Sequence, residues 1–119
     1  MELTEKEIED QCIQFFESAG CLVYKPNKFN SAIKAHLRNI DKGAPDLWLF
    51  YQGTTIGCEI KKPKGTQSAD QIAFEARLKR QSIPYYLCRG LDDAQNILRE
   101  IKELASGRRL SEARSLSGF

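Results

Sequence analysis

Residues 46–61 decide the fold, and they read DLWLFYQGTTIGCEIK. Two runs rich in aromatic and β-branched residues flank Gln52-Gly53, a dipeptide suited to a two-residue hairpin turn. With this turn, or with a four-residue loop, Asp46 lies directly opposite Glu59, whereas a three-residue loop would break the pairing. Directly opposed residues share one face of a sheet, with Cβ atoms about 4.5–5.5 Å apart. The stretch therefore predicts an antiparallel hairpin with two carboxylates side by side.

Two carboxylates in this position favour a cation between them, because like charges placed opposite each other destabilise a sheet. Oxygen ligands favour Mg²⁺ or Mn²⁺, which can bind a phosphate oxygen and lower the pKa of a bound water. Lys61 follows Glu59 by two residues and so shares its face, where it can orient that water or stabilise developing charge. The alternative is that Glu59 and Lys61 form a solvated strand face and Asp46 is a turn residue. The pattern favours metal-assisted hydrolysis of a phosphodiester.

Helix and strand signals alternate on either side of the hairpin. Capping boxes begin at Thr4 and Ser68, each with Glu or Gln three residues later. We expect helices from Thr4 to Gly20, from Ser68 to about Arg80 and from Asp92 to Ser106-Gly107. Strands are expected over residues 21–24, 46–51, 54–61 and 84–88. This order predicts an α/β fold with a mixed central sheet flanked by helices. Residues 27–42 form a basic loop with one helical turn around 32–37, and residues 108–119 a flexible basic tail.

The composition fits one globular domain. The chain has 119 residues, of which 41% are hydrophobic and 29% charged. It has no apolar run long enough to span a membrane and no signal-peptide pattern at its start, so we expect a cytoplasmic protein.

Its four cysteines form no CxxC pair, which favours reduced core thiols over a zinc site. The net charge of +2 conceals a basic middle after an acidic first helix, and a basic middle suggests a nucleic-acid partner.

Two motifs carry a family resemblance. Gly43-Ala44-Pro45-Asp46-Leu47 followed by Glu59-Ile60-Lys61 resembles the PD-(D/E)XK nuclease signature. The run 59–65 (EIKKPKG), Gln71 in a helix and the run 83–87 (IPYYL) resemble the virus-type replication-repair nuclease (VRR-NUC) domain. The similarity extends from about Glu5 to Leu104. It implies a restriction-endonuclease-like αβββαβ(α) core over residues 1–107.

The resemblance also implies roles for individual residues. Metal ligation would fall to Asp46, Glu59, the backbone carbonyl of Ile60, and Glu9, directly or through a water. Lys61 would be the catalytic lysine, and Gln71 would orient the site. Glu5 competes with Glu9, which could instead lie on an exposed helix face, and Gln71 could simply close the Ser68 capping box.

The implied activity is that of a Mg²⁺- or Mn²⁺-dependent endodeoxyribonuclease that hydrolyses phosphodiester bonds in branched or structured DNA. Proteins of this size in the family are phage or bacterial, and often form homodimers resembling Holliday-junction resolvases. A non-catalytic DNA-binding or assembly module with the same fold is the alternative, and RNA is the alternative substrate. No base-reading motif, membrane segment or small-molecule cofactor is expected. Contacts to DNA phosphates are expected from Lys62, Lys64, Lys42, Arg38 and Lys28.

Overall fold

The computed structural model describes residues 2–26 and 42–117, and for residues 108–117 it describes only the backbone. The described elements are α1 (Glu5–Ser18), β1 (Leu22–Tyr24), β2 (Leu47–Tyr51), β3 (Thr54–Ile60), α3 (Ala69–Arg80), β4 (Tyr85–Cys88) and α4 (Leu91–Ser117). The basic loop expected over residues 27–42, with its helical turn, lies outside the described residues except for Lys42.

The four described strands form one mixed sheet in the order β1-β2-β3-β4. β1, β2 and β3 are antiparallel neighbours, and β4 joins β3 in parallel after the chain crosses over through α3. Gln52 and Gly53 both have positive φ, at 46° and 83°, as a type I′ hairpin turn requires. Trp48 lies opposite Gly57, so the predicted register is confirmed.

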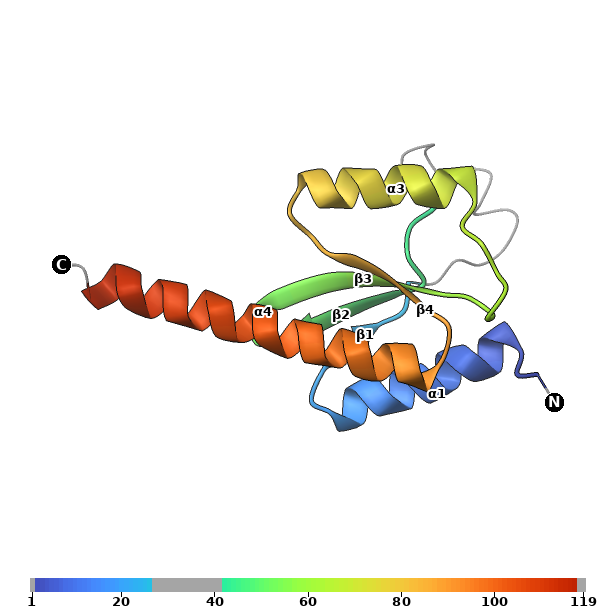
Figure 1. The fold of residues 1–119 in the computed structure, drawn as a ribbon, viewed down its shortest axis with the longest axis horizontal. Helices are drawn as coiled ribbons and strands as arrows, with labels where there is room; N and C mark the ends of the chain where they lie inside the picture. The colour runs from blue at the N-terminus through green and yellow to red at the C-terminus, as the bar shows by residue number, and fades with distance from the viewer. Residues whose placement is uncertain (1, 27–41, 118–119) are drawn as a thin grey trace.

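Helices cover both faces of the sheet, which confirms the predicted α/β class (Figure 1). α1 and α4 lie on one face and α3 on the other. The main core lies on the α1–α4 side, where alternate strand residues point toward the two helices. Its fully buried members include Phe16, Leu47, Leu49, Ile56, Ile60 and Ile101. Burying one large aliphatic side chain contributes roughly 1.5–3 kcal/mol.

The four cysteines are free and buried, as expected. The Sγ atoms of Cys12 on α1 and Cys88 on β4 lie 3.5 Å apart. The hydrogen bond to Cys88, together with burial, raises the pKa of the Cys12 thiol. These thiols therefore belong to the core that joins α1 to the sheet.

Both predicted capping boxes are present. The Thr4 side chain accepts a hydrogen bond from the amide of Glu7, whose carboxylate accepts one from the Thr4 amide. Ser68 and Gln71 form the same reciprocal pair at the start of α3. Each box satisfies two backbone amides that the helix itself cannot bond.

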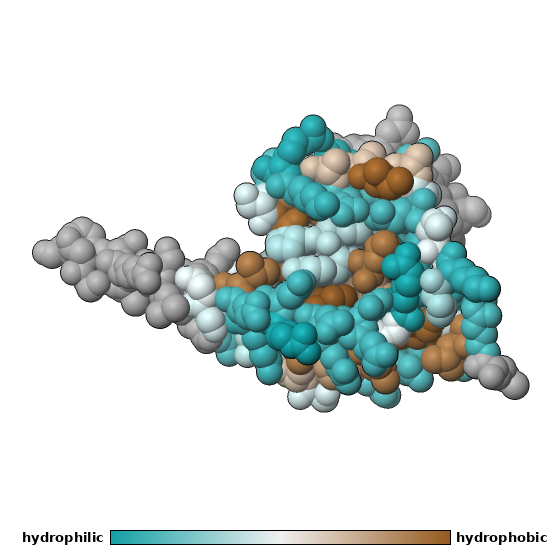
Figure 2. Space-filling view, viewed as in Figure 1, coloured by the Kyte–Doolittle hydropathy of each residue, from teal (hydrophilic) through white to brown (hydrophobic). Residues whose placement is uncertain are grey.

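The predicted end of the last helix at Ser106-Gly107 is wrong, because α4 continues to Ser117. A single glycine within a helix costs only about 1 kcal/mol relative to alanine, and the residues after Gly107 are mostly good helix formers. The side of α4 that faces the viewer in Figure 2 is largely hydrophilic up to the uncertain residues. None of the helices in residues 2–26 and 42–117 is long and apolar enough to cross a membrane.

Candidate active site

The loop before β2 fixes the position of Asp46 by packing directly on α3. Gly43 has φ +84°, and a Cβ built there would lie only 2.1 Å from the backbone oxygen of Asp70. Only glycine therefore allows this approach. Pro45 is fully buried and packs against Gly57, where an added Cβ would meet the Pro45 Cγ at 3.0 Å. The motif Gly-Ala-Pro-Asp thus wedges the chain between β3 and the first turn of α3.

The carboxylates of Asp46 and Glu59 are held together by each other's strands. The backbone N–H of Asp46 donates to Glu59 Oε1 at 3.1 Å, and the N–H of Ile60 donates to Asp46 Oδ2 at 2.9 Å. The paired residues of β2 and β3 end just before this point, at Leu47 and Cys58. Side-chain oxygens therefore continue the pairing where the backbone ladder stops. The structure places the two acids next to each other, as the hairpin register predicts.

Glu59 is almost completely buried, with 2% of its surface exposed. A buried carboxylate is costly unless it is hydrogen bonded and near a positive charge. The side-chain amide of Gln71 donates to Glu59 Oε2, and Lys61 Nζ lies 4.0 Å from the same oxygen. Lys61 is itself largely buried, with 15% of its side chain exposed. Among the described residues, Lys61 thus places an ammonium group next to the buried Glu59 carboxylate.

Gln71 combines the two roles that the sequence left open. Its Oε1 accepts a hydrogen bond of 2.9 Å from the Ser68 amide, which closes the capping box of α3. With the oxygen engaged there, the NH₂ group is directed at Glu59. The start of α3 therefore orients the amide that binds the carboxylate.

The two candidate acids of α1 differ in their surroundings. Glu9 pairs with Lys25, with 3.0 Å between Oε1 and Nζ, and Glu5 is exposed in the first turn of α1. In the described part of the chain, no three Asp, Glu, His or Cys side chains gather closely enough to hold a metal. The structure thus brings Asp46 and Glu59 together, and the role of Glu9 at the metal stays a prediction. The predicted Ile60 ligand lies between Glu59 and Lys61, with its side chain in the core.

Two residues near the site were missed from the sequence. Tyr85 lies beside Gly57 on the face that α3 covers, and its hydroxyl is buried without a hydrogen bond to any described residue. Burial raises the pKa of this phenol. Arg89 donates to the backbone oxygen of Gly65 at 3.0 Å and so holds the basic turn after β3. Neither contact has a sequence signal, because both depend on β4 lying parallel to β3.

The basic residues expected to contact DNA are only partly described. Lys42, Lys62 and Lys64 are exposed, the last two on the turn that Arg89 holds. Arg38 and Lys28 lie outside the described residues. The three described lysines are accessible to a polyanion near the end of β3 that carries the acids.

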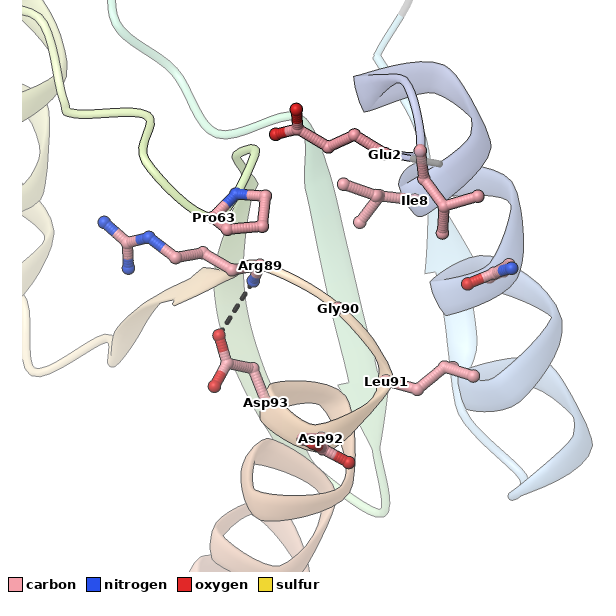
Figure 3. A pocket seen from close by; sticks show the side chains of 10 residues that line it. Glu2, Ile8, Pro63, Arg89, Gly90, Leu91, Asp92 and Asp93 are labelled. Atoms are coloured by element: carbon pink, nitrogen blue, oxygen red, sulfur yellow. Dashed lines mark hydrogen bonds between the residues drawn. The ribbon is translucent and has the colours of Figure 1, made fainter.

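A separate pocket of about 610 Å³ opens between the start of α1 and the start of α4 (Figure 3). Its lining includes Glu2, Pro63, Arg89, Asp92 and Asp93. The Asp93 carboxylate accepts a hydrogen bond of 2.8 Å from the Arg89 backbone amide and so caps α4. The pocket is lined by none of the residues Asp46, Glu59, Lys61 and Gln71, so it is not the candidate active site.

Compared with protein-family models and with curated proteins, the chain matches none.

Proposed function

We propose that the protein is a divalent-metal-dependent DNA endonuclease of the PD-(D/E)XK class, similar to VRR-NUC domains, with a restriction-endonuclease-like core. The observation that carries this proposal is the reciprocal hydrogen bonding of Asp46 and Glu59 beside Lys61. Two acids and a lysine on adjacent strand ends are the side chains that the Pro-Asp…Glu-x-Lys motif names. The described order of elements agrees with such a core.

The acid pair fits a hard divalent cation. Mg²⁺ is usually held by one or two carboxylates, with waters and substrate phosphates completing its shell, so a third acidic ligand is not required. Asp46 and Glu59 would hold the ion, and the Ile60 carbonyl or Glu9 through a water could add to the shell. When bound, such an ion polarises a phosphoryl oxygen and lowers the pKa of a coordinated water.

Gln71 and Lys61 position the Glu59 carboxylate and offset its negative charge. Gln71 keeps Glu59 in place from the start of α3, and Lys61 offers an ammonium group to the attacking water or to the charge that develops on the phosphate. With a metal ion held by Asp46 and Glu59, Lys61 would be available to the substrate as well as to Glu59.

A nicking assay with Mg²⁺ or Mn²⁺ tests the proposal. We expect Asp46→Ala and Glu59→Ala each to lower the cleavage rate by about 100-fold or more, the scale seen when an electrostatic catalytic group is removed. Glu103→Gln, which neutralises an exposed acid on α4, is the control and should cleave normally. Thermal unfolding of each variant separates loss of catalysis from loss of fold. Unchanged cleavage in both alanine variants would contradict the assignment, and DNA binding without cleavage by the wild type would favour a non-catalytic module.

Branched DNA is the proposed substrate, and a homodimer the proposed assembly. Symmetric resolution of a four-way junction needs two cuts and hence two active sites related by a two-fold axis. Light scattering that gives one chain mass would argue against junction resolution. A parallel panel of DNA and RNA substrates tests the class of nucleic acid.

A further inference from the structure

The sheet has one face that α3 covers only in part. Over β3 and β4 this face is closed, since Leu78 of α3 lies over Gly57 and Tyr85 is buried. Over β1 and β2, no helix among residues 2–26 and 42–117 closes it. Leu22 is 67% exposed, Tyr24 57% and Phe50 37%.

The register puts these side chains together. Leu22 lies opposite Phe50, and Tyr24 lies opposite Trp48, which is half-buried. Opposed residues share a face, so the four side chains form one surface of two strands, which we call the aromatic platform. Three of its four members carry rings.

The aromatic platform is continuous with the candidate active site. Asp46, Trp48 and Phe50 alternate along one stretch of chain and point to the same face. At about 3.3 Å per residue, Trp48 lies roughly 7 Å and Phe50 roughly 13 Å along the strand from Asp46. A strand of DNA whose phosphate reaches Asp46 could therefore lay its next bases on these rings.

Chemistry and size favour nucleobases as the occupant. Aromatic side chains on an open sheet stack with unpaired bases of any sequence. The platform itself is uncharged, whereas the exposed Lys62 and Lys64 stand beyond the Glu59 end of β3, which suits a ligand with apolar bases and an anionic backbone. A second copy of the chain would need more surface, because stable interfaces use about 20–30 residues a side.

We propose that the aromatic platform binds unpaired bases of a DNA strand and delivers the adjoining phosphate to Asp46 and Glu59. This inference rests on the proposed nuclease function and narrows its substrate class. Bases within a duplex are already stacked on one another, and exposing them costs energy. The preferred substrates are thus forks, flaps and junctions that have unpaired bases beside a duplex.

Binding to two matched forks tests the platform without cleavage. Each fork has a labelled duplex and one single-stranded arm of about ten nucleotides, with bases in one fork and abasic in the other. Fluorescence anisotropy of the full chain is measured in EDTA. We expect the wild type to bind the base-bearing arm about tenfold or more tightly than the abasic arm, on the scale of single base–aromatic stacks.

Variants then assign this preference to the rings. Tyr24→Ala/Phe50→Ala leaves the half-buried Trp48 as the one ring of the platform and should lose most of the preference, whereas Tyr24→Phe, which keeps the ring, should retain it. Phe50→Leu keeps apolar surface without a ring and should weaken it. Leu104→Ala, which trims an exposed apolar side chain on α4, is the control and should behave as wild type. Thermal unfolding confirms that each variant is folded.

Three results would overturn the platform: no preference in the wild type, an undiminished preference in the double variant, or a wild-type dimer that the double variant makes monomeric. The last would assign the patch to a second copy. Cleavage of the base-bearing fork with Mg²⁺ separates the two proposals. If the wild type cleaves but the double variant keeps its preference, only the platform fails. If the preference follows the rings but no metal supports cleavage, only the nuclease assignment fails.

Discussion

Glu59 is a buried carboxylate that accepts hydrogen bonds on both of its oxygens. Oε1 accepts from the Asp46 backbone amide and Oε2 from the Gln71 side chain, and the Glu59 side chain is almost inaccessible to water. Gln71 cannot easily turn its amide over, because its oxygen is engaged by Ser68. Both oxygen positions of the Glu59 side chain thus face hydrogen-bond donors.

We predict that Glu59→Gln destabilises the fold although it conserves shape. The new NH₂ group must face either the Asp46 N–H or the Gln71 NH₂, and either choice leaves buried donors unpaired, at a cost of about 1–3 kcal/mol. Urea unfolding measures this cost. Glu75→Gln is the matched control, since Glu75 also accepts from two donors, Gln67 and Lys79, but water reaches it. Equal unfolding midpoints for Glu59→Gln and the wild type would argue against two fixed donors.

At the scale of elements, the site depends on the contact between the loop before β2 and the start of α3. Gly43 touches the first turn of α3, and Gln71 of that turn binds Glu59 of β3. Asp46 follows Gly43 by three residues in the chain and is hydrogen bonded to Glu59, so its position depends on both contacts. A change that moves α3 away from the loop should therefore disturb both acids without altering either of them.

Gly43→Ala tests this coupling. The added methyl group would meet the Asp70 backbone at 2.1 Å and would force a left-handed residue to carry a side chain. We expect cleavage to fall by at least about tenfold together with a loss of stability of roughly 1–3 kcal/mol. Gly90→Ala is the control, because a methyl group there meets nothing within 4 Å. Normal cleavage and stability in Gly43→Ala would show that the loop can shift without affecting Asp46.

Local sequence signals predict the hairpin and the helix starts well. The Gln52-Gly53 turn fixes which residues of β2 and β3 face each other, so the meeting of Asp46 and Glu59 follows from local chemistry. The Ser68 box places Gln71 in the first turn of α3 for the same reason. What these signals omit is the position of α3 over the sheet, and hence the contact of Gly43 with Asp70.

At the scale of the whole molecule, prediction is weaker, because packing between distant segments decides it. Glu9 is accurately placed on α1, but its pairing with Lys25 depends on how α1 lies against β1. The burial of Tyr85 depends on β4 pairing in parallel with β3. The predicted end of the last helix at Gly107 is too early, because the helix formers after this glycine outweigh its cost.

The C-terminal part of α4 extends beyond the sheet (Figure 1). The described buried positions of α4 are Ala94, Ile97, Ile101 and Ala105, which recur at helical spacing. We expect removal of residues 108–119 to change the free energy of unfolding by less than about 0.5 kcal/mol, as for surface changes that touch no core contact. Removal of residues 101–119 should cost several times more, since loss of a buried Ile alone costs about 2–5 kcal/mol.

Urea unfolding of the two shortened chains, beside the full chain, makes this comparison. The residues removed first include Arg108, Arg109 and Arg114, so DNA affinity should fall and depend less steeply on salt even where stability is unchanged. Equal destabilisation by both truncations would mean that the extension packs against the rest of the molecule, and that the domain does not end at residue 107. If stability and salt dependence are both unchanged when residues 108–119 are removed, the domain ends at residue 107 but these residues do not contribute to DNA binding.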